Sequence, residues 1–368
     1  MINPQKRAEE IRPKMMKDGK YLIARLEGSN QEKDPEKLIG NYFRWKQYIG
    51  YHTPYEEEWL KDSLEKVWSP KYLGLSEDFW SKPIEQVKKL EFQNPALSGA
   101  YALNGKHGDP RNYSKVFAVQ VSGCDYLCNY CYVPPAINQA NPEHGRFFSP
   151  KEIVDDFLLV RKKSDTPINV LRITGGEGPT IIPEIVRDIY GELESRGRED
   201  VYLWIDTNLS TPKYLEKLEG DLKNIMKRNN VGAVGCFKGV SKEDFSLITG
   251  SEPSFHKKQF ETAKLLLDWN TDFYVYHPAL VYEHNIEKKI RNFSSNLKNL
   301  NKDLPLRTEI LIVKNYPGAI MNMEKKSKQG RPLPNVDQKA FFDIWHNQVL
   351  PSMYSEEMLN KYCCEVPL

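Results

Sequence analysis

Three of the chain's six cysteines lie within eight residues, in the stretch SGCDYLCNYCYVPP that begins at Ser122. Cys124, Cys128 and Cys131 have the spacing C-x3-C-x2-C. Three such thiolates can hold three corners of a cubane iron-sulfur cluster, which leaves the fourth iron without a protein ligand. A zinc site with a distant fourth ligand, or three structural thiols, would use the same residues. Because structural zinc usually takes two separated pairs of ligands and no second C-x2-C exists, the spacing favours the cluster.

The composition indicates a globular protein without a strong electrostatic preference. The 368 residues include 52 Lys plus Arg and 50 Asp plus Glu, for a net charge of +2. This balance gives no reason to expect nucleic acid or an anionic membrane surface as a partner. The sequence has no apolar run of about eighteen residues and no apolar signal segment at its start. We therefore expect a cytoplasmic protein, where clustered thiols hold metal or do redox work.

The elements that must position the cysteines are strands alternating with helices. Apolar strands alternating with helices predict a parallel sheet with right-handed crossovers, and such sheets bind ligands at the carboxyl ends of their strands. Six units are too few for an eight-fold barrel, so we expect an α/β fold with a partial, open (β/α)6 TIM-like barrel. Three helix starts carry N-cap signals, at Ser149–Pro150–Glu152, Thr211–Pro212 and Ser241 with Asp244. The expected strands are VFAVQV from Val116, INVLRIT from Ile168, VYLWID from Val201, VGAVGCF from Val231, FYVYHPALV from Phe273 and LRTEILIV from Leu306.

The chain divides into three blocks by composition. Residues 1–112 hold four of the seven tryptophans and are expected to form a mostly helical N-terminal extension. Residues 113–320 carry the barrel pattern, and residues 321–368 form a C-terminal cap or tail. In that tail Cys363 and Cys364 are adjacent, so a second cluster would need other thiols, and only Cys236 remains. We expect buried thiols there, with a redox-labile pair as the alternative.

A second motif, Gly175–Gly176–Glu177, directly follows the second expected strand. Glycines allow close backbone approach to a ligand, and polar groups at a strand edge can hold an ammonium group. The cysteine motif, in which Tyr130 precedes Cys131, resembles the cluster motif of the radical S-adenosylmethionine (radical SAM) superfamily. Gly175–Gly176–Glu177 resembles the GGE motif of the same superfamily. The resemblance implies a [4Fe-4S] cluster on the three cysteines and S-adenosylmethionine (SAM) bound through its amino group by the GGE segment.

Two further segments resemble one branch of that superfamily, the glycyl-radical activating enzymes. Asp206, Thr207 and Asn208 end the third strand and resemble the DTNG segment whose polar groups face the SAM ribose, with Leu209 in place of the glycine. Residues 235–250 resemble the fourth-strand region, with Lys238 at the position of a family lysine. Residues Cys236 and Phe237 stand where those enzymes have aspartate and isoleucine. The resemblance covers roughly residues 114–315.

Aromatic and histidine side chains near these motifs complete the set of expected cofactor contacts. Tyr132 follows the last cysteine and is expected over the adenine, with core packing as the alternative. Tyr276 and His277 alternate between the faces of the fifth strand, so either one can reach the cavity. We include His277 among the expected cofactor-binding residues, with a hydrogen-bonded core position as its other interpretation.

Three charged residues in or after strands have two open interpretations each. Arg172 and Lys238 can meet the SAM carboxylate or a substrate acid, or can pair with a neighbouring carboxylate. Glu309 in the sixth strand contacts substrate or ribose if it points inward, and is otherwise a paired, helix-facing acid.

The resemblance implies a radical SAM enzyme that cleaves SAM reductively and abstracts hydrogen from a substrate. A protein glycyl residue or a peptide is the leading expected target, and a small molecule or a nucleotide such as tRNA is the alternative. A low-potential electron donor, ferredoxin or flavodoxin, is implied as a partner. The non-enzymatic alternative is a zinc-stapled binding module.

Overall fold

The computed structural model describes residues 1–24, 43–47, 115–131, 133, 135–163, 168–282, 285–311, 313, 317–328, 330, 338–359, 361 and 366–368. The predictions for Tyr132, Cys363 and Cys364, and for most of the tryptophan-rich N-terminal block, lie outside these residues. All six expected strands are present, as β4 (Lys115–Val121), β6 (Val170–Gly175), β7 (Tyr202–Thr207), β8 (Val231–Cys236), β9 (Asp272–Pro278) and β10 (Thr308–Leu311).

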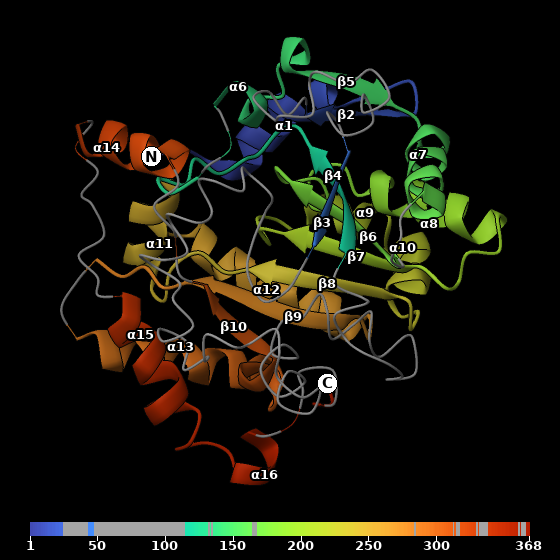
Figure 1. The fold of residues 1–368 in the computed structure, drawn as a ribbon. Coiled ribbons are helices and arrows are strands. Elements are labelled where there is room, and N and C mark those ends of the chain that lie inside the picture. The colour runs from blue at the N-terminus through green and yellow to red at the C-terminus, as the bar shows by residue number, and fades with distance from the viewer. Residues whose placement is uncertain are drawn as a thin grey trace.

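These six strands form one parallel sheet in the order in which they occur in the chain (Figure 1). Each pairs with its successor, from β4 with β6 to β9 with β10, in parallel register. The predicted mixed α/β fold with a mostly parallel central sheet is therefore confirmed. Among the described residues β10 pairs only with β9, so closure into a six-unit barrel stays a prediction.

The N-terminal block adds antiparallel strands that the sequence analysis did not anticipate. Its described part contains the helix α1 (Pro4–Met15) and the strands β1 (Met16–Lys17), β2 (Lys20–Ala24) and β3 (Phe43–Gln47). Strands β2 and β3 both pair antiparallel with β4, on the side that β6 leaves free. Strand β5 (Gly145–Phe148) extends this edge by pairing with β2. The described part of residues 1–112 contains both helix and strand, and a mostly helical extension over the whole block stays a prediction.

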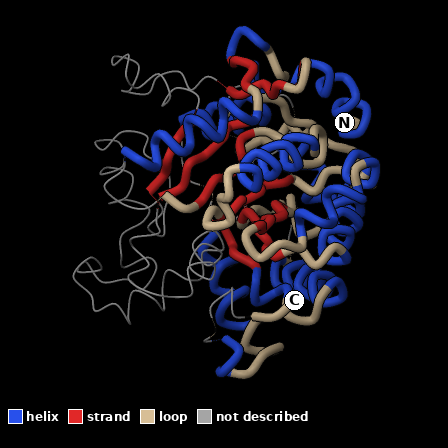
Figure 2. The backbone as a smooth tube through the Cα atoms, turned by 90° about the vertical axis from the view of Figure 1, so that its right-hand side faces the viewer, coloured by secondary structure: helices blue, strands red, loops and turns tan. Residues whose placement is uncertain are grey.

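Helices follow the strands and pack as a layer against one side of the sheet, as Figure 2 shows. The predicted capping box is present, since Ser149 N donates to Glu152 Oε2 at 2.8 Å and Glu152 N donates to Ser149 Oγ at 3.2 Å. Ser241 Oγ accepts from Asp244 N at 3.2 Å, which confirms another predicted start. The helices are α6 (Pro135–Asn138), α7 (Pro150–Lys163), α8 (Glu184–Ser195), α9 (Lys213–Lys217), α10 (Glu219–Met226), α11 (Lys242–Thr249), α12 (Phe255–Asp268) and α13 (Ile286–Leu300).

The C-terminal part contains α14 (Pro317–Lys328), α15 (Gln338–Ile344), a π-helical turn at Trp345–Val349 and α16 (Glu356–Leu359). Helix α15 and the π-helical turn pack against helix α13, whereas Asn322 of α14 donates its Nδ2 hydrogen to Cys131 O. The buried Trp345 ring lies 6.3 Å from the ring of Phe293 on α13. None of the described helices is long and apolar enough to span a membrane.

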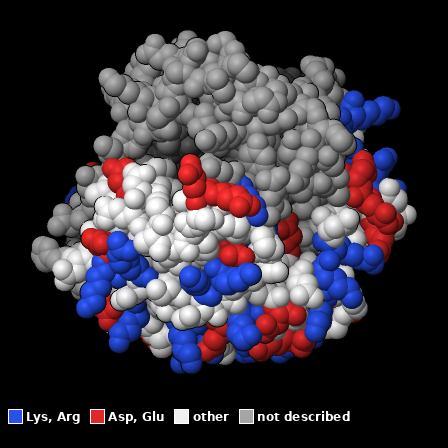
Figure 3. Space-filling model, turned by 90° about the horizontal axis from the view of Figure 1, so that it is seen from below, with Lys and Arg blue, Asp and Glu red and all other residues white. Residues whose placement is uncertain are grey.

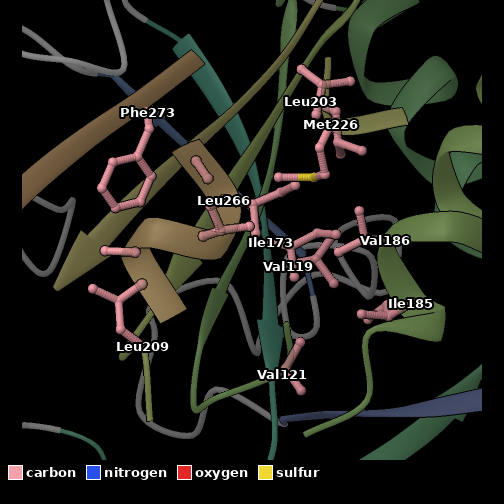
Figure 4. Packing of buried hydrophobic residues seen from close by; sticks show 14 of the residues in the cluster. Val119, Val121, Ile173, Ile185, Val186, Leu203, Leu209, Met226, Leu266 and Phe273 are labelled. Atoms are coloured by element: carbon pink, nitrogen blue, oxygen red, sulfur yellow. The ribbon is translucent and has the colours of Figure 1, made fainter. Parts of the chain in front are cut away.

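The two faces of the sheet bury different kinds of side chain. The helix-facing side is apolar, and Figure 4 shows Val119, Ile173, Leu203 and Phe273 packed against residues of the helices such as Leu266. The opposite side, here called the inner face, carries an aromatic cluster of Tyr202, Trp204, Tyr274 and Tyr276 with Val170 and Val234. Outside, acidic and basic side chains are interspersed over the face seen in Figure 3.

Candidate functional site

The cysteine loop leaves the carboxyl end of β4 and is fixed by backbone hydrogen bonds on both sides. Gly123 N donates to Ile137 O at 2.8 Å, and Cys124 N donates to Asn138 O at 3.0 Å. The Arg7 guanidinium of α1 donates to Cys124 O at 3.0 Å. The loop is therefore held by α6 and by the N-terminal helix, and these hydrogen bonds fix the backbone at the start of the cysteine motif.

All three motif cysteines are half-buried, and none of them forms a disulfide with another described cysteine. Asn208 Nδ2 lies 3.2 Å from Cys124 Sγ, and Asn138 Nδ2 lies 3.5 Å from Cys131 Sγ. Burial raises the pKa of the Cys124 thiol well above its ordinary value, and the nearby Asp125, Cys128 and Cys131 raise it further. The Cys124 thiol is therefore close enough to the other two cysteines for their charges to affect its pKa.

The three thiols are the type of donor that an iron-sulfur cluster uses. Across the described ranges, no group of three or more His, Cys, Asp or Glu side chains is arranged to hold one metal ion. Since iron-sulfur clusters are bound by cysteine sulfur, three thiols without a histidine or carboxylate ligand match that chemistry.

The GGE segment is hydrogen-bonded directly to the cysteine loop. Gly176 N donates to Val121 O at 2.8 Å, and Glu177 N donates to Gly123 O at 2.7 Å. A Cβ at residue 176 would lie 1.9 Å from the carbonyl oxygen of Gly123, so this approach requires glycine. Gly175 has φ +104°, which also excludes an ordinary side chain. The two predicted motifs therefore form one unit at the carboxyl edge of the sheet.

The Glu177 side chain is fully buried and joins the GGE segment to the end of β7. Its Oε1 accepts from Thr180 N at 2.9 Å, Thr180 Oγ1 at 2.8 Å and Thr207 Oγ1 at 3.0 Å. Its Oε2 accepts from Asn208 N. Burial raises the pKa of Glu177, and these hydrogen bonds oppose that effect. Glu177 thus positions Thr207 and Asn208, two of the residues expected at the ribose.

Asp206 differs from the expectation of a ribose contact, because its carboxylate is already bound. Arg172 Nε donates to both Asp206 oxygens at 3.0 and 2.9 Å, and Trp204 Nε1 donates to Oδ1 at 2.7 Å. Asp206 is the third residue of a run Trp204, Ile205, Asp206, so the alternation of the strand places it on the inner face with Trp204. Of the two interpretations open for Arg172, the structure shows the carboxylate pair.

Leu209 takes the conformation that a glycine would supply at this position. Its φ is +57°, in the left-handed region that is unfavourable for a branched side chain. Leu209 N donates to Thr207 Oγ1 at 3.0 Å, and the side chain is completely buried. A Cβ at Gly235 would come within 2.6 Å of Leu209 Cδ1. Leu209 is therefore held in a left-handed turn after β7, and a glycine on β8 leaves room for its side chain.

Lys238 and Tyr130 lie together beside the cysteine loop. Lys238 Nζ is 5.7 Å from the centroid of the Tyr130 ring, and the residue is 8% exposed. Burial lowers the pKa of Lys238, but Tyr130, Cys236 and Cys128 outweigh burial and hold it well above its usual value. Lys238 is thus a buried cation next to the motif, as expected for a residue that binds an anionic group.

Gln259 on α12 is a site residue that the sequence analysis missed. Its Nε2 donates to Asn208 O at 2.6 Å and to Cys236 O at 3.1 Å, and its Oε1 accepts from Lys238 N at 3.0 Å. The side chain is fully buried. It ties the ends of β7 and β8 to each other. The only signal in the sequence was a polar residue on the apolar stripe of a helix, between Phe255 and Ala263.

His277 was wrongly expected at the cofactor. The structure buries it completely on the helix-facing side of β9, where its ring stacks on Phe341 at 5.3 Å and lies 4.6 Å from Phe293. Burial lowers the pKa of His277 to about 3. Successive strand residues point to opposite faces, so Tyr276 is the one on the inner face. Tyr132 lies outside the described residues.

Comparison with known proteins locates the family signal in the same segment. Residues 120–230 match a family model described as the Radical SAM superfamily. That range contains the three cysteines, the GGE segment and residues 206–208. No curated protein matches the chain.

Solved structures that resemble the chain have low identity and low overlap. His-tagged anSMEcpe with bound AdoMet is 13% identical with a TM-score of 0.38, over 63% of this chain and 57% of its own. SuiB of Streptococcus suis bound to the precursor peptide SuiA is 15% identical with a TM-score of 0.39, over 77% and 63%. A mutant of spore photoproduct lyase is 13% identical with a TM-score of 0.38, over 59% and 60%.

This chain spans less than two thirds of the length of each of these structures. The match to the family model does not depend on them, and it covers the segment whose motifs meet at the sheet edge. Similarity to the radical SAM superfamily is thus located in residues 120–230, which hold both the cysteine motif and the GGE segment.

Proposed function

We propose that this protein is a radical SAM enzyme that cleaves SAM reductively and abstracts hydrogen from a substrate. The observation that carries the proposal is the junction of three motifs at one edge of the sheet. Glu177 N binds Gly123 O of the cysteine loop at 2.7 Å, and Asn208 Nδ2 reaches Cys124 Sγ at 3.2 Å. When bound, a [4Fe-4S] cluster and SAM supply one-electron cleavage to methionine and a 5′-deoxyadenosyl radical.

The chain's own residues then have distinct roles. Cys124, Cys128 and Cys131 hold the cluster, and the Gly175–Gly176 backbone gives the close approach that a bound amino acid group needs. Thr207 and Asn208 present polar groups that Glu177 orients. Lys238, a buried cation beside Tyr130, is placed to bind a carboxylate.

The substrate and the electron donor are proposed from sequence resemblance. Residues 206–208 and 235–250 resemble glycyl-radical activating enzymes, so we propose a protein or peptide residue as the hydrogen donor. Reduction of a low-potential cluster calls for a donor such as ferredoxin or flavodoxin.

The test compares wild-type protein with a variant in which all three motif cysteines are replaced by Ala. Both are reconstituted anaerobically with iron and sulfide, reduced with dithionite and mixed with SAM, and 5′-deoxyadenosine and methionine are measured with the visible absorbance of the cluster. We expect wild type to form both products and the variant to lose cluster and products completely. Cys236→Ala is the matched control and keeps the cluster. Zinc without sulfide in wild type, or a full cluster in the triple variant, would refute the assignment.

A further inference from the structure

Three residues of neighbouring strands form a polar row on the inner face, close to the carboxyl edge. Cys236 of β8 is in register with Tyr276 of β9, and Tyr276 is in register with Glu309 of β10. Residues in register on parallel strands point to the same face. Glu309 therefore faces inward, on the side of Arg172 and Asp206.

The Glu309 carboxyl has one oxygen without a hydrogen-bond partner. Its Oε2 is buried and accepts no hydrogen bond in the part of the chain that the structure describes, although the charge of Arg172 acts on this carboxyl. The inward acids Asp206 and Asp272 are in contrast both bound. Arg172 and Trp204 donate to Asp206, and Arg307 and Tyr202 donate to Asp272. A buried carboxylate with an unsatisfied oxygen is costly, so a site that keeps one is suited to receive a donor group from a ligand.

The position of Glu309 relates it to the proposed active site. Two strand spacings, about 10 Å along the sheet, separate β10 from β8. At β8, Cys236 O accepts from Gln259, which also holds Asn208 beside Cys124. A ligand group at Glu309 would therefore lie on the same face and at the same edge as the cysteine loop, a few strands away from it.

We propose that Glu309 determines substrate specificity by binding a cationic group of the substrate, an ammonium or a guanidinium. This inference rests on the proposed function and names a substrate class for that site. A cation satisfies both the charge and the hydrogen-bonding capacity of the buried carboxylate, whereas a neutral donor satisfies only the second.

The pH dependence of binding follows from the groups on this face. Burial raises the pKa of Glu309 to about 8, while Arg172 opposes the rise. Burial raises the pKa of Cys236 to about 11 and that of Tyr276 well above its usual value. Arg172 and Arg307 stay charged in their pairs with Asp206 and Asp272. Among these groups Glu309 is the one whose pKa lies between 7 and 9, so cation binding strengthens as the pH rises through about 8.

The experiment measures binding of two probes to the reconstituted full chain by ligand-observed NMR titration. The probes are n-butylammonium and n-butanol, which match in length and differ in charge. Wild type is compared with Glu309→Gln, which removes the charge at constant shape, and with Glu309→Asp, which keeps it. Glu287→Gln is the control, because Glu287 lies on the surface of α13 in an exposed pair with Arg291.

At pH 8.5 we expect wild type and Glu287→Gln to bind the ammonium about tenfold or more tightly than the alcohol. Glu309→Gln should reduce this preference to within about twofold, and Glu309→Asp should retain part of it. Equal binding of both probes by wild type, or an undiminished preference in Glu309→Gln, overturns the proposal. The titration needs no turnover, so its failure is distinct from failure of SAM cleavage in the wild-type assay.

Discussion

The two faces of the central sheet carry different kinds of side chain, which come from residues that alternate along the same strands. On the helix-facing side, Leu203 and Ile173 are fully buried among apolar neighbours. On the inner face, Arg172 and Asp206 form a largely buried ion pair beside Trp204, and Glu309 Oε2 has no hydrogen-bond partner among the described residues. One face stabilises the fold through packing, and the other keeps charge out of water at a cost in stability. The binding role that we propose for Glu309 uses this second face.

Breaking the inner ion pair should produce the largest loss. Arg172→Ala leaves the Asp206 carboxylate buried without its cation, so we expect the free energy of unfolding to fall by about 3–5 kcal/mol. Urea denaturation of the variant and of wild type measures the difference. The exposed pair Arg291–Glu287 is the control, since Arg291→Ala should cost about 1 kcal/mol or less. Similar losses in both variants would contradict the contrast between the inner face and the surface.

Truncating a buried side chain on the helix-facing side should lower the free energy of unfolding somewhat less than Arg172→Ala does. Leu203 is completely buried in the cluster that Figure 4 shows, so Leu203→Ala is expected to lower the free energy of unfolding by about 3 kcal/mol. Leu159, which is 40% exposed on α7, provides the matched control, and its replacement by Ala should change the same quantity by about 0.5 kcal/mol or less. A loss at Leu203 no larger than at Leu159 would show that this face is loosely packed.

The pH dependence of the free energy of unfolding should have opposite signs for His277 on the helix-facing side and Glu309 on the inner face. Burial lowers the pKa of His277 to about 3, below its unfolded value near 6.5, so the unfolded chain binds more protons between these values. Stability from His277 therefore falls as the pH drops below about 6.5, by roughly 1.4 kcal/mol per pH unit. Glu309 has a folded pKa raised to about 8, so its contribution falls as the pH rises from about 4.5 to 8.

Unfolding free energies measured across pH 4 to 9 test both signs. His277→Phe should remove the loss on the acid side, because Phe fits between Phe293 and Phe341 and does not titrate. Glu309→Gln should remove the loss between pH 5 and 8. Slopes that match wild type in both variants would assign the pH dependence to other groups.

Much of the parallel sheet was predictable from local signals. Six apolar runs, the capping box at Ser149 and the cap at Ser241 each follow from a few neighbouring residues, and all are present. The order of the motifs also followed, because a cysteine loop after the first strand and a GGE segment after the second must meet at one edge of a parallel sheet.

The antiparallel edge was not predictable in this way. Strands β2 and β3 pair with β4 across long separations in sequence, and β2 and β5 are short. Gln259 likewise acts through backbone groups of β7 and β8 that are far from it in the chain. No pattern among neighbouring residues predicts contacts between segments that are so far apart in the sequence.

By itself, then, the sequence determined which residues carry the chemistry and the order in which strands present them. Only the tertiary structure decided where each side chain points and what it binds. The strands of a buried parallel sheet are apolar on both faces, so the pattern could not tell whether Tyr276 or His277 faced inward. Likewise, the sequence did not show whether Asp206 meets a ligand or another side chain. In the structure Arg172 of the neighbouring strand lies 2.9 Å from its carboxylate, because charge pairing across strands depends on register.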